Sequence, residues 1–497
     1  MVVLEEPIKK VRTLKNYING EWVESQSDVI VDVVNPANMK VIAKVPRSNA
    51  GDVGAAVEAA AEAFPEWRRT TPLARSRYLF RLKELLEEAF EDISRIGTME
   101  HGKIIDESRG ETRRGIENVE VATGIPSLMM GYNLEDIARG IDEYVIRQPL
   151  GVFACIAPFN FPFMVPLWFL PYAVATGNTY ILKPSSEVPL SMTKLFELLD
   201  EVGFPPGVVN MVHGGREVVQ AVLRHPGIKG VSFVGSTPVG RDIVYKIGAA
   251  HGKRVQAQCG AKNFFVVMPD AVLDRTVASS MTSFYGNTGQ RCLSGANLII
   301  VGEDDEFYRD VVNKVVDAAR SIRIGYGLDE SVQMGPLRSS DKKRKVLEYI
   351  EKGLEEEAKL ILDGRQFEIV GDHPDDCFLG ASVFEDVTTD MVIAQDEIFG
   401  PVMSVMRAKD LDEAVDLVNA CPFANASMLY TSSGKAARQF QYEVECGNIG
   451  INVGIAAPMA FFPFSGMKDS FFGSLHGQGR DAISFFTEQK VVIQRWF

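Results

Sequence analysis

The chain has 497 residues, of which 46% are hydrophobic and 24% are charged, and its formal net charge is -14 at pH 7. This length is enough for two or three domains with large cores. The acidic balance argues against nucleic acid as the main partner, because phosphate binding requires a cationic surface.

Targeting and membrane signals are absent from the sequence pattern. Residues 1–17 carry early acids and no long apolar core, so they do not read as a secretory signal. The most apolar stretch, 151–182, is interrupted by prolines and is expected to form buried strands and a helix, not a membrane span. The six cysteines show no CxxC or CxxH pairing, which predicts neither a metal site nor a disulfide framework. A reducing, cytoplasmic location is the expectation.

The first half of the chain begins with helical segments and continues with strands that alternate with helices. Apolar side chains recur every three or four residues in 51–67 and 73–97, which predicts two amphipathic helices. From residue 152 onward, short apolar runs alternate with helical segments. We expect strands at 152–157, 179–182, 207–212 and 230–234, and helices at 190–202, 215–224 and 238–249. This alternation predicts a parallel sheet covered on both faces.

A second α/β series follows Asn263. Its expected strands are 264–267, 298–301, 402–406 and 428–430, and its expected helices are 306–322 and 339–360. The last residues, 489–497, alternate apolar and polar side chains and end on aromatics. An apolar terminal strand is costly to leave in water, so we expect it to pair with another subunit in a homodimer or homotetramer.

Cys292 is the candidate nucleophile. It follows a run of small residues, 285–289, and stands next to the fixed positive charge of Arg291. A neighbouring arginine or a helix N-terminus lowers a thiol pKa, and the thiolate is the reactive form. The alternative is that Cys292 is one more buried and inert cysteine.

Two segments are suited to bind a nucleotide. Gly235 and Ser236 lie in a turn between a predicted strand and helix, where backbone NH groups can approach a pyrophosphate. The turn matches neither GxGxxG nor GxxxxGK[ST], so a plain strand–helix connection is the alternative. Lys183 follows the strand 179–182, at the edge where parallel sheets bind ligands. An ordinary surface lysine is the competing interpretation.

Several segments together resemble the aldehyde dehydrogenase superfamily, over residues 15–497. They are Pro158-Phe159-Asn160-Phe161-Pro162, Lys183-Pro184-Ser185-Ser186, Gly235-Ser236-Thr237, Gly289-Gln290-Arg291-Cys292 and Glu397-Ile398-Phe399-Gly400-Pro401. Segments 125–131, 140–152 and 156–162 are most similar to the methylmalonate-semialdehyde dehydrogenase branch, which acylates coenzyme A. The resemblance implies an α/β fold with three parts. These are a dinucleotide-binding domain (1–130 and 150–260), a catalytic domain (261–460) and a small β oligomerisation extension (131–149 and 476–497).

The resemblance also implies roles for named residues. The Cys292 thiolate would attack the aldehyde carbon of a small-molecule substrate, and hydride would pass to NAD or NADP. Asn160 and the Cys292 backbone NH would form the oxyanion hole. The implied cofactor contacts are Lys183 on the adenosine ribose, Gly235 and Ser236 on the pyrophosphate, Glu397 on the nicotinamide ribose and Phe399 beside the ring.

Gln258 is a departure from the hydrolytic members of the family. Those members place a glutamate before a Leu-Gly-Gly-Lys run, where it activates water, whereas this chain reads Gln258-Cys259-Gly260-Ala261-Lys262. Glutamine cannot accept a proton at neutral pH, and a general base typically contributes about 10²–10⁴-fold. We therefore expect the thiol of coenzyme A, instead of water, to release the acyl group. A weakened hydrolase, or a base supplied from elsewhere, is the alternative.

Ser186 is the second departure, because NAD-preferring relatives often have a glutamate there. A carboxylate would accept a hydrogen bond from the ribose 2′-hydroxyl and repel a 2′-phosphate. With serine in its place, we expect NADP to be tolerated or preferred.

Arg291 and Arg114 are the candidate substrate-binding residues, because arginine recognises carboxylates bidentately. An acidic semialdehyde is then expected: malonate or methylmalonate semialdehyde would leave as acetyl- or propionyl-CoA after losing CO₂. Arg114 could instead be a solvated helix charge. The rival functions are a non-acylating NADP-dependent dehydrogenase of another semialdehyde, such as succinate semialdehyde, and a catalytically silent structural protein.

Overall fold

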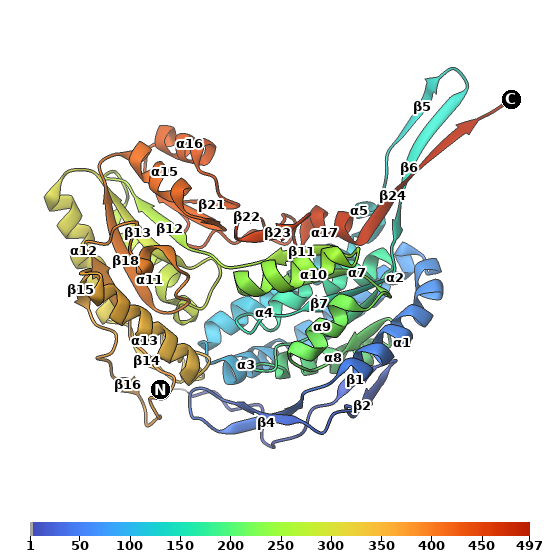
Figure 1. The fold of residues 1–497 in the computed structure, drawn as a ribbon, viewed down its shortest axis with the longest axis horizontal. Helices are drawn as coiled ribbons and strands as arrows, with labels where there is room; N and C mark the ends of the chain where they lie inside the picture. The colour runs from blue at the N-terminus through green and yellow to red at the C-terminus, as the bar shows by residue number, and fades with distance from the viewer. Residues whose placement is uncertain (1–2) are drawn as a thin grey trace.

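The computed structural model describes residues 3–497 and contains two large sheets that lie side by side (Figure 1). The first has eight strands, and its five central strands are parallel to one another. Its order is β2 (Glu21–Val23), β1 (Asn16–Ile18), β9 (Val209–Met211), β8 (Thr179–Lys183), β7 (Val152–Ile156), β10 (Ile228–Val234), β11 (Arg254–Gln258) and β23 (Phe471–Gly473). The strands expected in this half of the chain are confirmed.

The second sheet has seven strands and is parallel except at β15. Its order is β15 (Lys359–Leu362), β17 (Ser382–Glu385), β18 (Val402–Ala408), β13 (Gly295–Val301), β12 (Asn263–Val267), β20 (Ala426–Tyr430) and β21 (Asn448–Ile451). Its strands β12, β13, β18 and β20 contain the four segments expected from the sequence. Both sheets are nearly continuous in buried apolar residues, as parallel sheets covered on two faces require.

Helices cover these sheets, and most lie where periodicity predicts them. On the first sheet they are α1 (Ala50–Arg69), α2 (Pro72–Glu88), α3 (Phe90–His101), α4 (Ile105–Thr123), α5 (Ile125–Leu128), α6 (Met164–Leu167), α7 (Leu170–Thr176), α8 (Leu190–Val202), α9 (Arg216–Arg224), α10 (Lys246–Ala250) and α17 (Gly479–Phe486). On the second they are α11 (Leu273–Tyr285), α12 (Asp305–Arg320), α13 (Ser340–Glu355), α14 (Val392–Gln395), α15 (Leu411–Ala420) and α16 (Gly434–Glu443).

Two of the expected helices differ from the structure. The single helix expected at 73–97 is broken at Ala89, and α3 begins at Phe90 and runs on to His101. The helix expected at 238–249 begins as a π-helix, η1 (Val239–Tyr245), before α10. Its wider turn brings Gly240 so close to Cys259 that an added Cβ would lie 2.1 Å from the sulfur. A π-turn of this kind often marks a functional site.

α3 and α8 are joined by a buried carboxylate. Glu100, near the end of α3, accepts hydrogen bonds from the backbone NH groups of Leu190 (2.6 Å) and Ser191 (2.9 Å) at the start of α8. The first turn of α8 has no side-chain cap of its own, so Glu100 satisfies two of its free donors. This contact also fixes the segment that follows α3 and leads into α4.

A third sheet projects from the body as an arm (Figure 1). It is antiparallel, in the order β24 (Thr487–Arg495), β6 (Ile141–Pro149) and β5 (Asn133–Ala138). Val491 and Ile493 on β24 are 60% and 66% exposed, which leaves apolar surface on an edge strand. The C-terminal strand thus pairs with β6 of its own chain, and its second edge is open.

Smaller strands complete the fold. β3 (Ile30–Val34) and β4 (Val41–Pro46) form a hairpin near the N-terminus, and the short pairs are β14 (Ile324–Gly325) with β16 (Ile369–Val370) and β19 (Phe423–Ala424) with β22 (Met467–Lys468). None of the helices in residues 3–497 combines the length and apolar character needed to cross a bilayer.

Candidate functional site

The segment before Cys292 is a strained loop. It leaves α11 as a short 3₁₀ turn, η2 (Gly286–Gly289), in which Asn287, Thr288 and Gly289 have φ of 54°, 54° and 70°. Left-handed backbone at a residue other than glycine costs on the order of 1–3 kcal/mol and persists only where the surroundings impose it. A Cβ on Gly289 would lie 2.2 Å from the carbonyl oxygen of Gly400. The loop therefore packs directly on the segment that carries Glu397 and Phe399.

Hydrogen bonds hold this loop from several sides. The Asn287 amide donates to the Gln290 carbonyl (2.9 Å), and the Thr288 hydroxyl donates to the Gly335 carbonyl (2.9 Å). The Cys292 carbonyl accepts from the side-chain amides of Asn263 and Asn425, each at 2.8 Å. Asn263 begins β12 and Asn425 directly precedes β20, so the position of Cys292 depends on how these two strands pack.

Asn160, the residue expected in the oxyanion hole, contacts the segment that carries Cys292. Its buried side-chain amide nitrogen donates to the Gln290 carbonyl at 3.1 Å, two residues before Cys292. An amide nitrogen carries two hydrogens, and this bond uses one of them. The other remains available to a substrate oxygen.

A buried ion pair holds Asn160 in place. The Lys103 ammonium lies 2.7 Å from Glu111 and donates to the Asn160 carbonyl, also at 2.7 Å. It also lies 4.0 Å from the centre of the Phe161 ring. Glu111 in turn accepts the backbone NH of Phe163 at 2.8 Å. The side chains of Lys103 and Glu111 are 0% and 2% exposed, so removing one partner would leave an uncompensated buried charge.

Cys292, Arg291 and Arg114 meet at one cavity of about 320 Å³. Helix α4 forms one wall, and the segments around residues 161–168 and 455–464 form the others. Its lining comprises Asp106, Glu107, Gly110, Glu111, Arg114, Asn118, Phe161, Met164, Trp168, Thr282, Arg291, Cys292, Leu293, Ile455, Ala457, Pro458, Ala460, Phe464 and Gln478. The structure thus brings together the predicted nucleophile and both predicted substrate arginines.

Each arginine already has a carboxylate neighbour. The Arg291 guanidinium lies 3.6 Å from Glu107, and Arg114 lies 3.2 Å from Glu117. Glu107 also accepts the backbone NH of Asn287 in the strained loop. Burial raises the pKa of Glu107, and the charge of Arg291 opposes that effect.

The environment of Cys292 corrects the expectation of a thiolate held by Arg291. Burial is the main effect that raises the pKa of the Cys292 thiol, and the charge of Glu397 adds to it. Together they raise this pKa to about 12, because the opposing effect of Arg291 is smaller. This environment therefore favours the protonated thiol over the thiolate. The physical reason is that burial penalises the charged thiolate and that Glu397 repels it, and Arg291 does not outweigh these two effects.

Glu397 and Phe399, two of the residues expected to contact the cofactor, belong to the segment that packs against Gly289 of the loop. Burial raises the pKa of Glu397 to about 7, and its carboxylate accepts the Ala261 backbone NH at 2.8 Å. Phe399 has a φ of 57° and contacts the Phe159 ring edge-on at 5.9 Å. Glu397 thus lies beside the turn that follows β11, and Phe399 lies against the segment that carries Asn160.

The other predicted cofactor residues follow strands β8 and β10, whose carboxyl ends share one edge of the sheet. Lys183 is buried at the end of β8, and its ammonium donates no hydrogen bond to any residue in 3–497. The Ser186 hydroxyl donates to the Gly214 carbonyl at 3.1 Å. Gly235 donates its NH to the Gln258 carbonyl at 3.0 Å, and Ser236 is exposed. A buried cation with no partner in the described chain fits a nucleotide hydroxyl or phosphate.

Gln258 ends β11 and is buried. Its side-chain nitrogen donates to the Phe464 carbonyl at 2.9 Å, and its side-chain oxygen accepts no hydrogen bond within residues 3–497. Phe464 itself lines the cavity that holds Cys292. Gln258 is therefore fixed beside the substrate cavity as a neutral amide.

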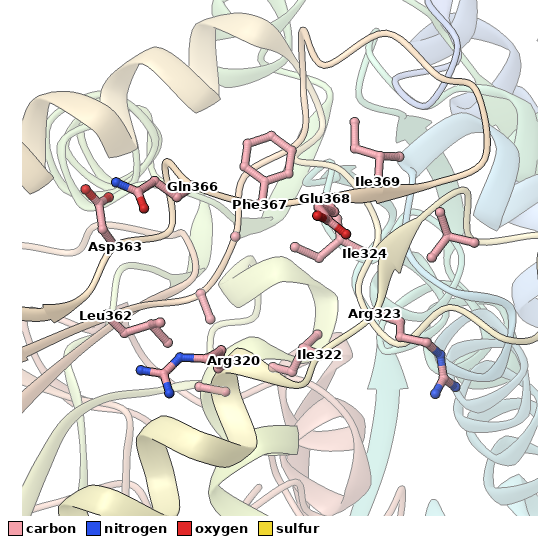
Figure 2. A pocket seen from close by; sticks show the side chains of 14 residues that line it. Arg320, Ile322, Arg323, Ile324, Leu362, Asp363, Gln366, Phe367, Glu368 and Ile369 are labelled. Atoms are coloured by element: carbon pink, nitrogen blue, oxygen red, sulfur yellow. The ribbon is translucent and has the colours of Figure 1, made fainter.

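A larger cavity, of about 820 Å³, lies elsewhere, between the end of α12 and the strands β14 and β16. Figure 2 shows Asp363 and Arg320 toward one end of it and Arg323 toward the other. None of the residues predicted for the site lines it. In the described part of the chain, no group of three or more His, Cys, Asp or Glu side chains is arranged to hold a metal ion.

Sequence reasoning missed Lys103, Glu107 and Glu111. All three lie on or just before α4, a helix with many charges and few apolar residues. The one available signal was the placement of two glutamates four residues apart, which puts them on the same helix face.

Comparison with known proteins gives one consistent result. The family model for the aldehyde dehydrogenase family matches residues 22–492. Malonate-semialdehyde dehydrogenase 2 of Geobacillus kaustophilus is 48% identical over 486 residues, covering 98% of this chain and 99% of that protein. The crystal structure of methylmalonate-semialdehyde dehydrogenase from Oceanimonas doudoroffii is 40% identical, with a TM-score of 0.95 and 98% of each chain covered. A Sinorhizobium meliloti protein provisionally given the same name, in complex with NAD, is 40% identical with a TM-score of 0.95, covering 98% of this chain and 99% of that one.

The Glu107–Arg291 contact predicts how Cys292 reacts. Glu107→Gln keeps an acceptor for the Asn287 NH but removes the charge that offsets Arg291, so the thiolate becomes more stable. The charged groups around Cys292 are then Arg291 and Glu397. We expect alkylation of Cys292 by iodoacetamide at pH 8 to be about three- to tenfold faster than in the parent protein.

Asp106→Asn is the matched control for this measurement. Asp106 is the preceding residue, but its side chain is 82% exposed and pairs with Arg109, so its removal should leave the alkylation rate nearly unchanged. Equal rates for the Glu107→Gln and parent proteins would contradict the role given to Glu107.

Proposed function

The chain belongs to the aldehyde dehydrogenase family and uses NAD or NADP, and we propose that it converts an acidic semialdehyde to a coenzyme A thioester. The substrate would be malonate or methylmalonate semialdehyde, and the product acetyl- or propionyl-CoA with release of CO₂. The observation that carries the proposal is Gln258, a neutral amide fixed beside a cavity that retains the nucleophile Cys292. The names of the similar proteins support the choice of substrate.

The residues of the site support the following sequence of steps. The Cys292 sulfur attacks the carbonyl carbon while its proton passes to water, and the carbonyl oxygen becomes an alkoxide. The free NH of the Asn160 amide and the Cys292 backbone NH would stabilise that oxygen. When bound, the nicotinamide accepts the hydride that leaves the former aldehyde carbon. Lys183, Gly235, Ser236, Glu397 and Phe399 would hold the cofactor for this step. Cys292 is left as a thioester.

Release of the acyl group depends on what can attack that thioester. A water molecule would need a base, and Gln258 cannot accept a proton at neutral pH. A thiol is a better nucleophile and, as coenzyme A, would form a new thioester while Cys292 leaves as thiolate. Loss of CO₂ breaks the bond to the substrate carboxylate, and its electron pair stays on the α-carbon, which then takes a proton from solvent.

Recognition of the substrate would depend on Arg114 and Arg291, which line the same cavity as Cys292. Their carboxylate neighbours, Glu117 and Glu107, are held at 3.2 and 3.6 Å. A substrate carboxylate can compete for guanidinium groups held at such distances, because an arginine carries five donors. An acidic semialdehyde would then place its carbonyl carbon near the sulfur.

We also propose a cytoplasmic homo-oligomer. All six cysteines are free in the structure, which suits a reducing compartment. The open edge of β24 carries exposed Val491 and Ile493, and an edge strand of this kind is a template for pairing with a second copy.

Product identification tests the acylation proposal. Turnover of malonate semialdehyde should yield acetyl-CoA when coenzyme A is present and little free acid when it is absent, as measured by mass spectrometry. Gln258→Glu should raise acid formation without thiol by about 10²-fold, because it supplies a base. Gln258→Met, which supplies none, should not. Free acid formed at full rate by the parent enzyme without thiol would overturn the proposal.

Arg114→Ala tests recognition of the carboxylate. It should raise KM for malonate semialdehyde by roughly 10- to 100-fold, the value of a charge-assisted hydrogen bond. KM for propanal, which lacks the acid group, should change less than about threefold. Arg113→Ala is the matched control. Arg113 forms an ion pair with Glu87 at a distance of 2.7 Å and does not line the cavity. An equal effect of Arg114→Ala on both substrates would remove the role given to Arg114.

The proposed assembly is tested by placing positive charges on β24, the strand with the open edge. Val491→Lys combined with Ile493→Lys should convert the parent dimer or tetramer to smaller species in sedimentation velocity, since the two ammonium groups would be buried in the interface. A parent protein that sediments as a monomer, or a double variant with unchanged mass, would contradict this proposal.

A further inference from the structure

Gln478 has a backbone conformation that few residues with a side chain adopt. It directly precedes α17 and has a φ of 56° and a ψ of 174°. This combination of angles is essentially restricted to glycine, and another residue persists in it only where the surrounding structure imposes it. Residues held in this way cluster at active sites and ligand-binding positions. Gln478 therefore carries a side chain at a position where the backbone alone would favour glycine.

The side chain of Gln478 binds three carbonyls of one turn. It is 2% exposed, and its Nε2 donates to the Phe462 carbonyl at 3.0 Å. The same nitrogen lies 3.4 Å from the carbonyls of Pro458 and Met459. An amide nitrogen has two hydrogens, so one serves Phe462 and the other is shared by the two more distant acceptors. Gln478 therefore fastens the turn formed by residues 458–462 from a single point.

The 458–462 turn forms one wall of the cavity that holds Cys292. Pro458 and Ala460 line this cavity, as does Gln478 itself. The large apolar side chains of the turn are in contact with solvent: the exposed fractions are 43% for Met459, 67% for Phe461 and 65% for Phe462. Burial of apolar surface therefore contributes little to holding the turn in place. Its position depends instead on hydrogen bonds.

Among the described residues, the side chains that donate to carbonyls of this turn are those of Gln478 and Tyr172. The Tyr172 hydroxyl lies 3.1 Å from the Ala460 carbonyl and 3.0 Å from the side-chain oxygen of Asn118. A hydroxyl has one hydrogen, so Tyr172 divides its donation between these two acceptors. The Gln478 amide donates to the turn alone. Gln478 is therefore the main side-chain donor that holds the turn.

The turn also lies against Arg114. The Arg114 guanidinium contacts the Met459 sulfur, and Arg114 and Cys292 line the same cavity. A semialdehyde in the proposed reaction must reach from Arg114, which would bind its carboxylate, to Cys292, which attacks its carbonyl carbon. The cavity volume of about 320 Å³ is at the small end of the range for ligand sites, about 300–1,000 Å³. The position of the turn therefore limits the room for a substrate.

We propose that Gln478 is a positioning residue that holds the 458–462 turn against the cavity and thereby restricts the substrate to short aldehydes. The inference deepens the proposed function, because it limits the chain length of the semialdehyde, and it rests on that function for the acid group only. Its physical basis is that a longer substrate must displace the turn. Displacement breaks the bonds from Gln478 and leaves a buried amide without acceptors, which is costly.

Initial rates of nicotinamide reduction with two aldehyde series test the inference. The neutral series is propanal, pentanal and heptanal, and the acidic series is malonate, succinate and glutarate semialdehyde. In the parent protein, kcat/KM should fall by about tenfold or more from the shortest to the longest member of each series. In Gln478→Gly, which removes the amide and suits the backbone, this ratio should shrink by about fivefold or more, because the turn yields. A parent kcat/KM that is independent of chain length, or rises with it, would overturn the inference.

Leu475→Gly is the matched control. Leu475 also has a positive φ, of 63°, but it does not line the cavity, so this change relieves backbone strain without freeing the turn. Its length ratio should stay within about twofold of the parent value. If Gln478→Gly does not fold, Gln478→Asn, whose amide is one methylene too short, should shift the ratio in the same direction. An unchanged ratio in the folded Gln478 variant, with activity lowered equally at all lengths, would overturn the inference. Failure of the proposed function is distinguishable, because the parent protein would then form no coenzyme A thioester while the neutral series would still report on length.

Discussion

The buried ammonium of Lys103 is the contact on which the catalytic geometry depends. It joins the Glu111 carboxylate and the Asn160 carbonyl, each at 2.7 Å, in a region that water does not reach. An isolated charge there would cost several kcal/mol, so helix α4 and the Asn160 segment cannot separate without losing that compensation. Because Asn160 in turn bonds to the Gln290 carbonyl, this ion pair is connected to the segment that carries Cys292, the candidate nucleophile.

The nucleophile loop shows how strain and electrostatics are balanced against each other. Three consecutive left-handed residues are retained because the Asn287 and Thr288 side chains and the Asn287 NH all have partners. The same Glu107 that accepts the Asn287 NH also faces Arg291. One carboxylate thus serves both to hold the loop and to moderate the charge beside the sulfur.

Much of the fold follows from sequence pattern, and the exceptions have physical reasons. The helix expected at 190–202 has the bounds of α8, because its apolar period is regular and Gly203 ends it. Strands of three residues such as β1 and β2 are too short to show a period, so they were not predicted. The two helices on either side of the break at Ala89 each pack against α4, a tertiary contact that no local pattern carries.

Some residues of the candidate site were predictable from the sequence, and others were not. Cys292, Arg291 and Arg114 were recognisable as residue types, and they do share one cavity. Glu107 was not recognisable from the sequence, because its effect on Arg291 comes from a contact between residues far apart in the chain. Sequence adjacency likewise placed a positive charge next to Cys292, but it could not show the burial of the sulfur or the charge of Glu397, which both raise the pKa of the thiol.

The high pKa of the Cys292 thiol has a consequence for chemical durability. Peroxide attacks thiolates far faster than thiols, and the sulfinic and sulfonic acids that follow are not readily reversed. The burial and the Glu397 charge that favour the thiol over the thiolate should therefore also slow oxidation of this sulfur while the cavity is empty.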